Sequence, residues 1–143
     1  MASEYSAVAL QTVAVDENII FTNNFRACRK GFIEHRNDSG IFYLKGAFNG
    51  CRATYRVTFD GNIAIATGGT VEPISVALTI NGEVLGNATA IATPAAIGDF
   101  WNVAITTFID IPCNCCVTVS VENTSDTTAI EVTNANIIFE RVA

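Results

Sequence analysis

Apolar and small polar residues alternate along most of this chain with the period of two that is typical of β-strands. The alternation is clearest over residues 51–59, 74–80 and 101–111, where nearly every second side chain is hydrophobic. No stretch shows the 3.6-residue period of an amphipathic helix. The pattern therefore predicts an all-β protein built from antiparallel strands.

Clusters of Gly, Asn, Asp and Pro separate the alternating segments roughly every 8–12 residues, a spacing typical of a β-sandwich or barrel. Asn81-Gly82 predicts a tight hairpin, because both central residues of a primed turn need a positive φ angle. Residues 60–61 (Asp-Gly) predict another turn, and a change of phase near Asn134 predicts a β-bulge. We expect eight to ten strands, some of them short and weak. The segments with strand character are residues 7–15, 19–21, 32–35, 41–47, 51–59, 62–66, 74–80, 83–92, 101–111, 116–122 and 130–142.

The composition indicates a single domain over residues 1–143 with an unusually neutral surface. A chain of this length can bury a core without help from disulfides or metal. Half of the residues are hydrophobic and only 15% are charged, against about 25% in an average domain. Part of the surface is therefore expected to be covered by further subunits, with a monomer of neutral, Thr-rich surface as the alternative.

Charge and hydropathy argue against nucleic acid and membrane as partners. The net charge is −6, from 8 basic and 14 acidic residues, which disfavours a phosphate-binding surface. No segment reaches the roughly 20 apolar residues of a membrane span. Residues 1–5 (MASEY) lack the basic and apolar regions of a secretory signal. We therefore expect a protein that is made in a cytoplasm and does not cross a membrane.

Five cysteines offer three alternatives. They are thiolate ligands or a redox pair, a disulfide that forms after exposure to oxidant, or buried thiols that behave as small hydrophobic side chains. No C-x-x-C pair joined to a second ligand pair is present, so we expect no metal and no cofactor, and we favour buried thiols, with Cys115 or Cys116 in a small core site. The five are Cys28, Cys51, Cys113, Cys115 and Cys116.

No catalytic constellation is apparent. His35 is the one histidine, and Ser39 and Asp38 lie in the same expected turn rather than in the separate elements that a catalytic triad uses. A G-x-S-x-G nucleophile elbow is missing. We therefore expect a protein without enzymatic activity and assign no catalytic residue.

Five aromatic residues have two interpretations. We favour packing in the core; alternatively, some of them lie at a subunit interface or form a platform for a sugar. They are Phe42, Tyr43, Tyr55, Phe100 and Trp101.

The order of motifs resembles that of small jelly-roll proteins of phages and prophages of gut Firmicutes. These in turn resemble the tumour-necrosis-factor-like trimeric heads of collagen-tailed bacterial surface proteins. The likeness covers nearly the whole chain, although the Gly-X-Y stretch and export signal of the collagen-tailed relatives are missing. The motifs are G-I-F-Y-L-K-G (40–46), C-R-A-T-Y-R-V-T-F (51–59), G-G-T-V-E-P-I-S-V-A-L (68–78), A-T-P-A-A-I-G-D-F-W-N-V (92–103), C-C-V-T-V-S-V-E-N-T-S (115–125) and N-A-N-I-I-F-E-R-V-A (134–143).

This resemblance implies a tumour-necrosis-factor-like jelly roll of ten strands that assembles as a homotrimer without catalytic residues. It further implies a structural virion protein, assembled in the host cytoplasm, that decorates a capsid or caps a fibre beside other capsid or fibre subunits. The alternative is an adhesive or carbohydrate-binding head that recognises a glycan on the host surface.

Overall fold

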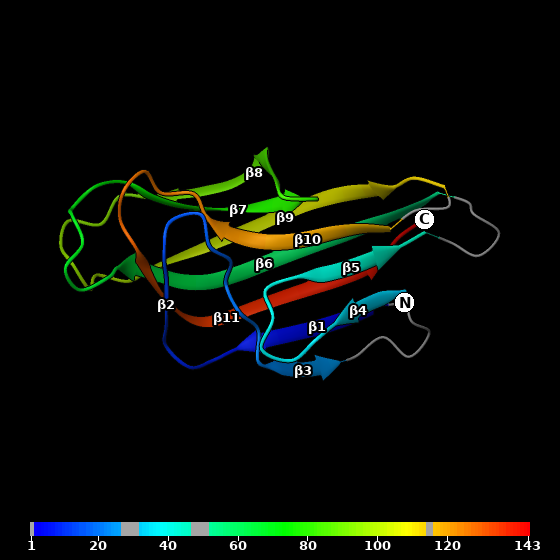
Figure 1. Ribbon diagram of the computed structural model, residues 1–143, viewed down its shortest axis with the longest axis horizontal. Helices are drawn as coiled ribbons and strands as arrows, with labels where there is room; N and C mark the ends of the chain where they lie inside the picture. Colours follow the sequence, from blue (N-terminus) through cyan, green and yellow to red (C-terminus); the bar gives the residue numbers. More distant parts are fainter. Residues whose placement is uncertain (1, 27–31, 47–51, 114–115) are drawn as a thin grey trace.

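The computed structural model describes residues 2–26, 32–46, 52–113 and 116–143. Within these residues the chain forms eleven strands and no helix, and hence none that could cross a membrane. The strands form two antiparallel sheets that stack face to face (Figure 1). The predicted all-β, two-sheet architecture is confirmed, with eleven strands in place of eight to ten.

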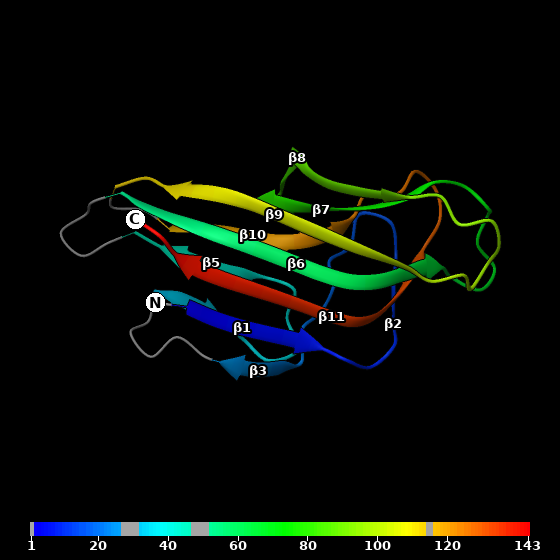
Figure 2. The same ribbon diagram turned by 180° about the vertical axis from the view of Figure 1, so that it is seen from behind.

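The first sheet has the strand order β3-β1-β11-β6-β9, with β2 also pairing with β11. Its two longest neighbours, β6 and β11, run side by side through its centre (Figure 2). Its strands are β1 (Ala2–Ala7), β2 (Gln11–Val13), β3 (Asn23–Arg26), β6 (Ala53–Ile65), β9 (Trp101–Ile111) and β11 (Ile130–Arg141).

The second sheet has the order β4-β5-β10-β7-β8. Its strands are β4 (Ile33–His35), β5 (Phe42–Lys45), β7 (Ile74–Ile80), β8 (Glu83–Ala92) and β10 (Cys116–Asn123). Because β4 and β8 end this sheet while β3 and β9 end the first, the sandwich has two open flanks, one along β8 and β9 and the other along β3 and β4.

The core lies between the sheets and is built from the inward-facing side chains that the period-two pattern predicts. Burying each large side chain contributes roughly 1.5–3 kcal/mol. The largest aromatic side chains of the core are Tyr5, Phe21, Phe42, Tyr55, Phe59 and Phe139. Phe42 is central among them, since its ring centroid lies 4.8 Å from that of Phe139 and 5.0 Å from that of Tyr5.

Several local predictions are confirmed. Asn81 and Gly82 have φ angles of 52° and 85° and join β7 to β8 in the predicted hairpin. Strands β8 and β9 have the predicted bounds. Asn134 has a φ angle of 54°, and the pairing of β11 with β6 shifts register between Thr133 and Asn136, as the change of phase indicates.

Two predictions near that bulge are wrong. Of the expected strand over residues 7–15, only Ala7, at the end of β1, and residues 11–13, which form β2, are in strands, because β1 and β2 pair with β11 on either side of its bulge. The expected turn at residues 60–61 is instead the middle of β6, where Gly61 lies opposite the bulge and its Cα hydrogen faces Ala135. A Cβ atom there would lie 3.4 Å from the Cα atom of Ala135, so glycine gives the bulged strand the space it needs.

Two further assignments change. Residues 23–26, which are not among the segments with strand character, form β3 because they extend the first sheet beyond β1. Residues 19–21, expected as a strand, form only isolated bridges through Asn18 and Phe21.

Candidate functional site

The flank formed by β8 and β9 carries an unusual number of exposed apolar side chains. Of thirteen exposed large hydrophobic residues in the described part of the chain, six lie on these two strands or the segment between them. They are Val84, Ile91, Ile97, Phe100, Trp101 and Phe108, and we call them the apolar flank. Figures 1 and 2 show β8 and β9 at the same edge of the sandwich.

The register of β9 explains why its aromatics are exposed. Phe108 points away from the core. Its neighbours along β9, Ile109 and Thr107, lie on the inward side, where Thr107 pairs with the buried Val57. Across the sheet Phe108 pairs with Arg56. The Phe108 side chain is 63% exposed. Trp101 lies on the side of β9 that faces inward, but it occupies the first position of the strand. Its indole Nε1–H is 3.4 Å from Asp99 Oδ2, and 45% of its surface is exposed.

A second apolar surface lies on the other side of β11, at the junction of β1 and β2. It is a groove of about 190 Å³ lined by Ala7, Ala9, Leu10, Gln11, Ile20 and Thr22. Gln11 fixes one wall, because its Nε2 donates to the Ile20 carbonyl at 2.8 Å and its Oε1 accepts from the Ile20 amide at 2.9 Å. The Gln11 side chain thus makes the two hydrogen bonds to the Ile20 backbone that a neighbouring strand would otherwise make.

The structure separates the five predicted aromatics into two groups. Phe42 and Tyr55 are fully buried, as the favoured interpretation of core packing predicts, because both lie on the inward-facing side of their strands. Phe100 and Trp101 come together on the apolar flank, and Tyr43 lies exposed on the second sheet. Phe108 and Ile91 were not selected from the sequence. Both alternate with inward-facing neighbours along their strands, and this pattern marks them as outward-facing.

The cysteines that the structure describes, Cys113 and Cys116, are both exposed. The expectation of a buried thiol is therefore wrong for Cys116, because it has the outward parity of β10, opposite to Val117. Cys28, Cys51 and Cys115 lie outside the described residues. Among the described side chains, no group of three or more His, Cys, Asp or Glu residues could hold a metal ion.

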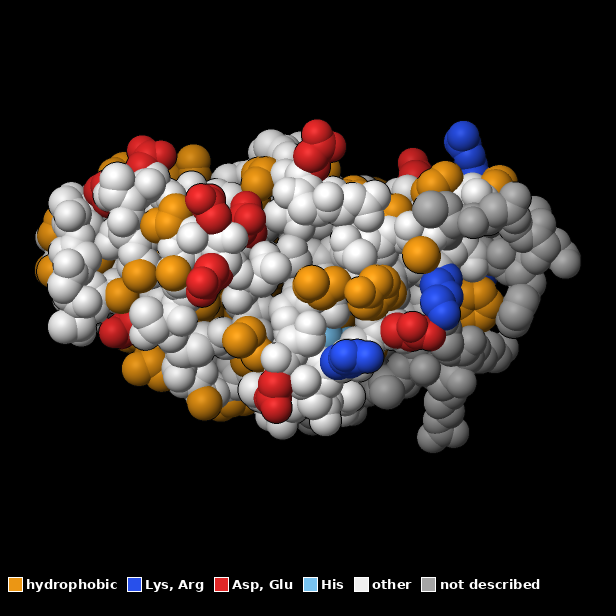
Figure 3. Space-filling view, viewed as in Figure 1, with side chains coloured by type: hydrophobic (Ala, Val, Ile, Leu, Met, Phe, Trp, Pro, Cys, Tyr) orange, Lys and Arg blue, Asp and Glu red, His pale blue; other side chains and the backbone are white. Residues whose placement is uncertain are grey.

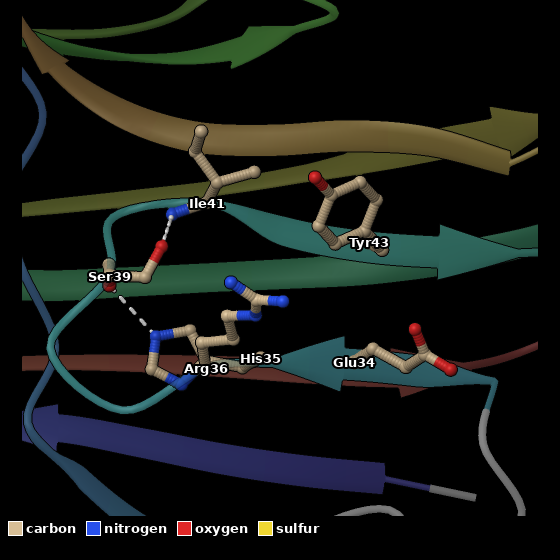
Figure 4. Close-up of a pocket in the computed structure, with 6 residues that line it drawn as sticks. All are labelled: Glu34, His35, Arg36, Ser39, Ile41 and Tyr43. Atoms are coloured by element: carbon tan, nitrogen blue, oxygen red, sulfur yellow. Dashed lines mark hydrogen bonds between the residues drawn. The ribbon is translucent and has the colours of Figure 1, made fainter.

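His35 borders a hollow of about 630 Å³ on the outer side of β4 and β5 (Figure 4). We call it the His35 hollow; it is lined by Glu34, His35, Arg36, Ser39, Ile41 and Tyr43. Figure 3 shows hydrophobic side chains over β5 on this face, next to basic and acidic ones, on a surface that is otherwise largely uncharged.

The imidazole of His35 ties this region together. Its Nε2 donates to the Ser39 carbonyl at 2.8 Å, and its Nδ1 lies 3.1 Å from the Asn24 side-chain oxygen on β3. The ring also stacks on Phe42, with 4.4 Å between centroids. His35 therefore closes the open flank between β3 and β4. Ser39 contacts the imidazole through its backbone carbonyl and not through its hydroxyl.

Removing the ring is expected to change how stability depends on pH. Burial lowers the pKa of His35 from its ordinary 6.5, against smaller opposite effects of the Ser39 hydrogen bond and Asp38. As the pH falls, the unfolded chain therefore takes up a proton on His35 before the folded chain does. The stability that the neutral imidazole contributes is complete above about pH 6.5 and is lost as the pH drops through the lower pKa of the folded state. In urea titrations between pH 7 and 5, His35→Gln should lose stability less steeply than the unchanged protein. Glu122, whose pKa is raised by burial and by Asp16, is common to both proteins and cancels in the comparison; equal slopes would contradict the prediction.

Comparison with known proteins identifies the fold. The sequence matches no protein-family model and no curated protein. Among solved structures, the globular domain of zebrafish complement 1qA protein is similar with a TM-score of 0.65 and 8% identity, over 99% of this chain and 97% of that one. Eiger TNF from S. frugiperda is similar with a TM-score of 0.68 and 12% identity, over 100% of this chain and 92% of that one. The two sheets of this chain therefore have the jelly-roll fold of complement C1q and tumour-necrosis-factor domains.

Proposed function

We propose that this protein is a non-catalytic structural subunit that assembles with copies of itself into a homotrimer and decorates a phage particle. The observation that carries the proposal is the apolar flank, whose six exposed side chains include three aromatic rings. Aromatic residues are enriched where subunits meet.

The position of the second apolar surface supports a closed assembly. The apolar flank and the groove beside Gln11 lie on opposite sides of β11. A contact between two different surfaces of identical subunits is heterologous, and such contacts close into a ring when the rotation allows it. Protruding side chains such as Phe108 on one copy would then face an apolar surface on the next.

The subunit number and the location rest on the resemblance noted from the sequence. That resemblance implies a homotrimer, as capsid decoration or as a fibre head beside other virion subunits, assembled in the host cytoplasm. Mass spectrometry of gradient-purified particles tests the location: the chain should copurify with the particles, and its absence from them would contradict a virion role.

Disrupting the apolar flank is expected to dissociate the assembly. Phe108→Asp places a charge where a subunit interface would exclude water, so sedimentation equilibrium at micromolar concentration should show a shift from trimer toward monomer. Tyr43→Asp is the matched control, because Tyr43 is a similarly exposed aromatic on β5, far along the sheet from β8. A monomeric unchanged protein, or equal behaviour of the two variants, would contradict the proposal.

A further inference from the structure

We propose that the His35 hollow is a binding site for a carboxylated sugar residue. At about 630 Å³ it has the volume of a small-molecule site. It lies at the β4 end of the second sheet, whereas the apolar flank lies at the β8 end. The hollow is therefore separate from the apolar flank of the same subunit, and this inference does not depend on the assembly.

The charge of the hollow favours an anion. The guanidinium of Arg36 forms no hydrogen bond or ion pair with any residue that the structure describes. The acidic side chain that lines the hollow, Glu34, is already paired with Lys45 at 2.7 Å. Asp38 follows on the same turn but is not part of the lining. One uncompensated positive charge thus faces the hollow on a protein whose net charge is −6.

The nature of that charge favours a carboxylate. A guanidinium is planar and presents paired N–H donors that match the two oxygens of a carboxylate. Figure 4 shows the Arg36 side chain reaching toward the space between Ile41 and Tyr43. An anionic group bound there would lie beside two exposed apolar side chains, 39% and 44% exposed.

The mixed lining favours a sugar as the body of that ligand. A pyranose ring has an apolar C–H face, suited to Tyr43 and Ile41, and a rim of hydroxyl groups. Glu34 and the Ser39 hydroxyl offer polar partners at the edge of the hollow. Pockets that combine an aromatic wall with a few polar groups hold ligands of this amphiphilic kind.

The turn that forms one wall is held in place before any ligand arrives. His35 donates to the Ser39 carbonyl, and the Ser39 hydroxyl accepts from the Ile41 amide at 3.1 Å. Asp38 adopts a φ angle of 62° within the same turn. The backbone that bears Arg36 and Ile41 is thus ordered before binding, which lowers the entropy cost of binding.

A peptide is the competing occupant. Extended peptides usually add a strand to an exposed sheet edge and bind through its backbone. The hollow is instead lined by side chains of β4, β5 and the turn between them, on the face of the sheet. That geometry suits a compact ring better than an added strand.

Titration calorimetry with matched ligands tests the proposal. Trigalacturonate and 3′-sialyllactose should bind, whereas the methyl ester of trigalacturonate and lactose should bind at least about tenfold more weakly. Loss of a charge-assisted hydrogen bond predicts that Arg36→Gln weakens acid-sugar binding by about 10- to 100-fold. Arg56→Gln, which removes an exposed guanidinium from the first sheet, where it pairs with Glu140, should leave the affinity unchanged.

Each other result overturns the proposal. Failure of both acidic sugars to saturate the protein excludes the ligand class, as does equal binding of the neutral partners. An equal effect of Arg36→Gln and Arg56→Gln excludes this location. A triglutamate peptide that binds more tightly than either sugar assigns the hollow to an acidic peptide. Sedimentation of the same samples separates these outcomes from a failure of assembly, since Arg36→Gln should sediment like the unchanged protein.

Discussion

Replacing Phe42 by Ala is expected to lower the free energy of unfolding by about 3–5 kcal/mol. Phe42 has no exposed surface, and its ring lies against those of Tyr5, Phe21, His35 and Phe139. Truncation removes contacts with all four rings and leaves a cavity between the sheets. Urea denaturation followed by circular dichroism, at one fixed protein concentration, measures the loss.

The neighbouring residue provides the control. Tyr43 faces solvent from the other side of β5, so Tyr43→Ala should change stability by only about 0.5 kcal/mol. Because a strand displaced by one residue exchanges its two faces, the two variants also test the register of β5. Similar losses for both would show that the register differs from that described here.

The sequence predicts the fold well wherever local rules act alone. The hairpin at Asn81 and Gly82 follows from the φ angles its turn needs, and strands β8 and β9 follow from their alternation. The bulge at Asn134 is visible as a change of phase. In each case the signal and the structure it produces lie within the same few residues.

Prediction fails where a distant strand decides the outcome. Residues 60–61 have the composition of a turn, yet Gly61 pairs with Val103 on β9 and faces the bulge of β11. The run of residues 7–15 alternates like one strand and is divided by the same bulge. Pairing partners so far away in sequence leave no local signal.

The same distinction applies to the candidate sites. The alternation marks Phe108 and Ile91 as outward-facing, although neither was selected from the sequence, and their position at one edge of the sandwich depends on the order of strands in both sheets. The hollow depends on still more, since β4, β5 and the turn between them all line it, and its acidic residue Glu34 pairs with Lys45, eleven residues away.

Asn123 is the polar side chain whose loss should cost most. It is fully buried at the end of β10, where its Nδ2 donates to the Val13 carbonyl at 3.0 Å and the Thr128 carbonyl at 3.2 Å, while its Oδ1 accepts from the Ser125 amide. These bonds connect the second sheet to β2 of the first and fix the following turn. Asn123→Ala removes the side-chain partner of three buried backbone groups at about 1–3 kcal/mol each, so we expect a loss of at least about 3 kcal/mol.

Asn123→Asp tests this explanation with almost no change of shape. The carboxylate can still accept from Ser125, but it has no donor for the two carbonyls and brings a charge into the core. Burial raises the pKa of such a carboxyl above its unfolded value, so the deficit relative to the unchanged protein should be largest near pH 7 and shrink toward pH 4. Protonation restores one of the two donors. Urea titrations across this range measure the difference, and a deficit independent of pH would mean that the side chain at this position is not enclosed by the hydrogen bonds described above.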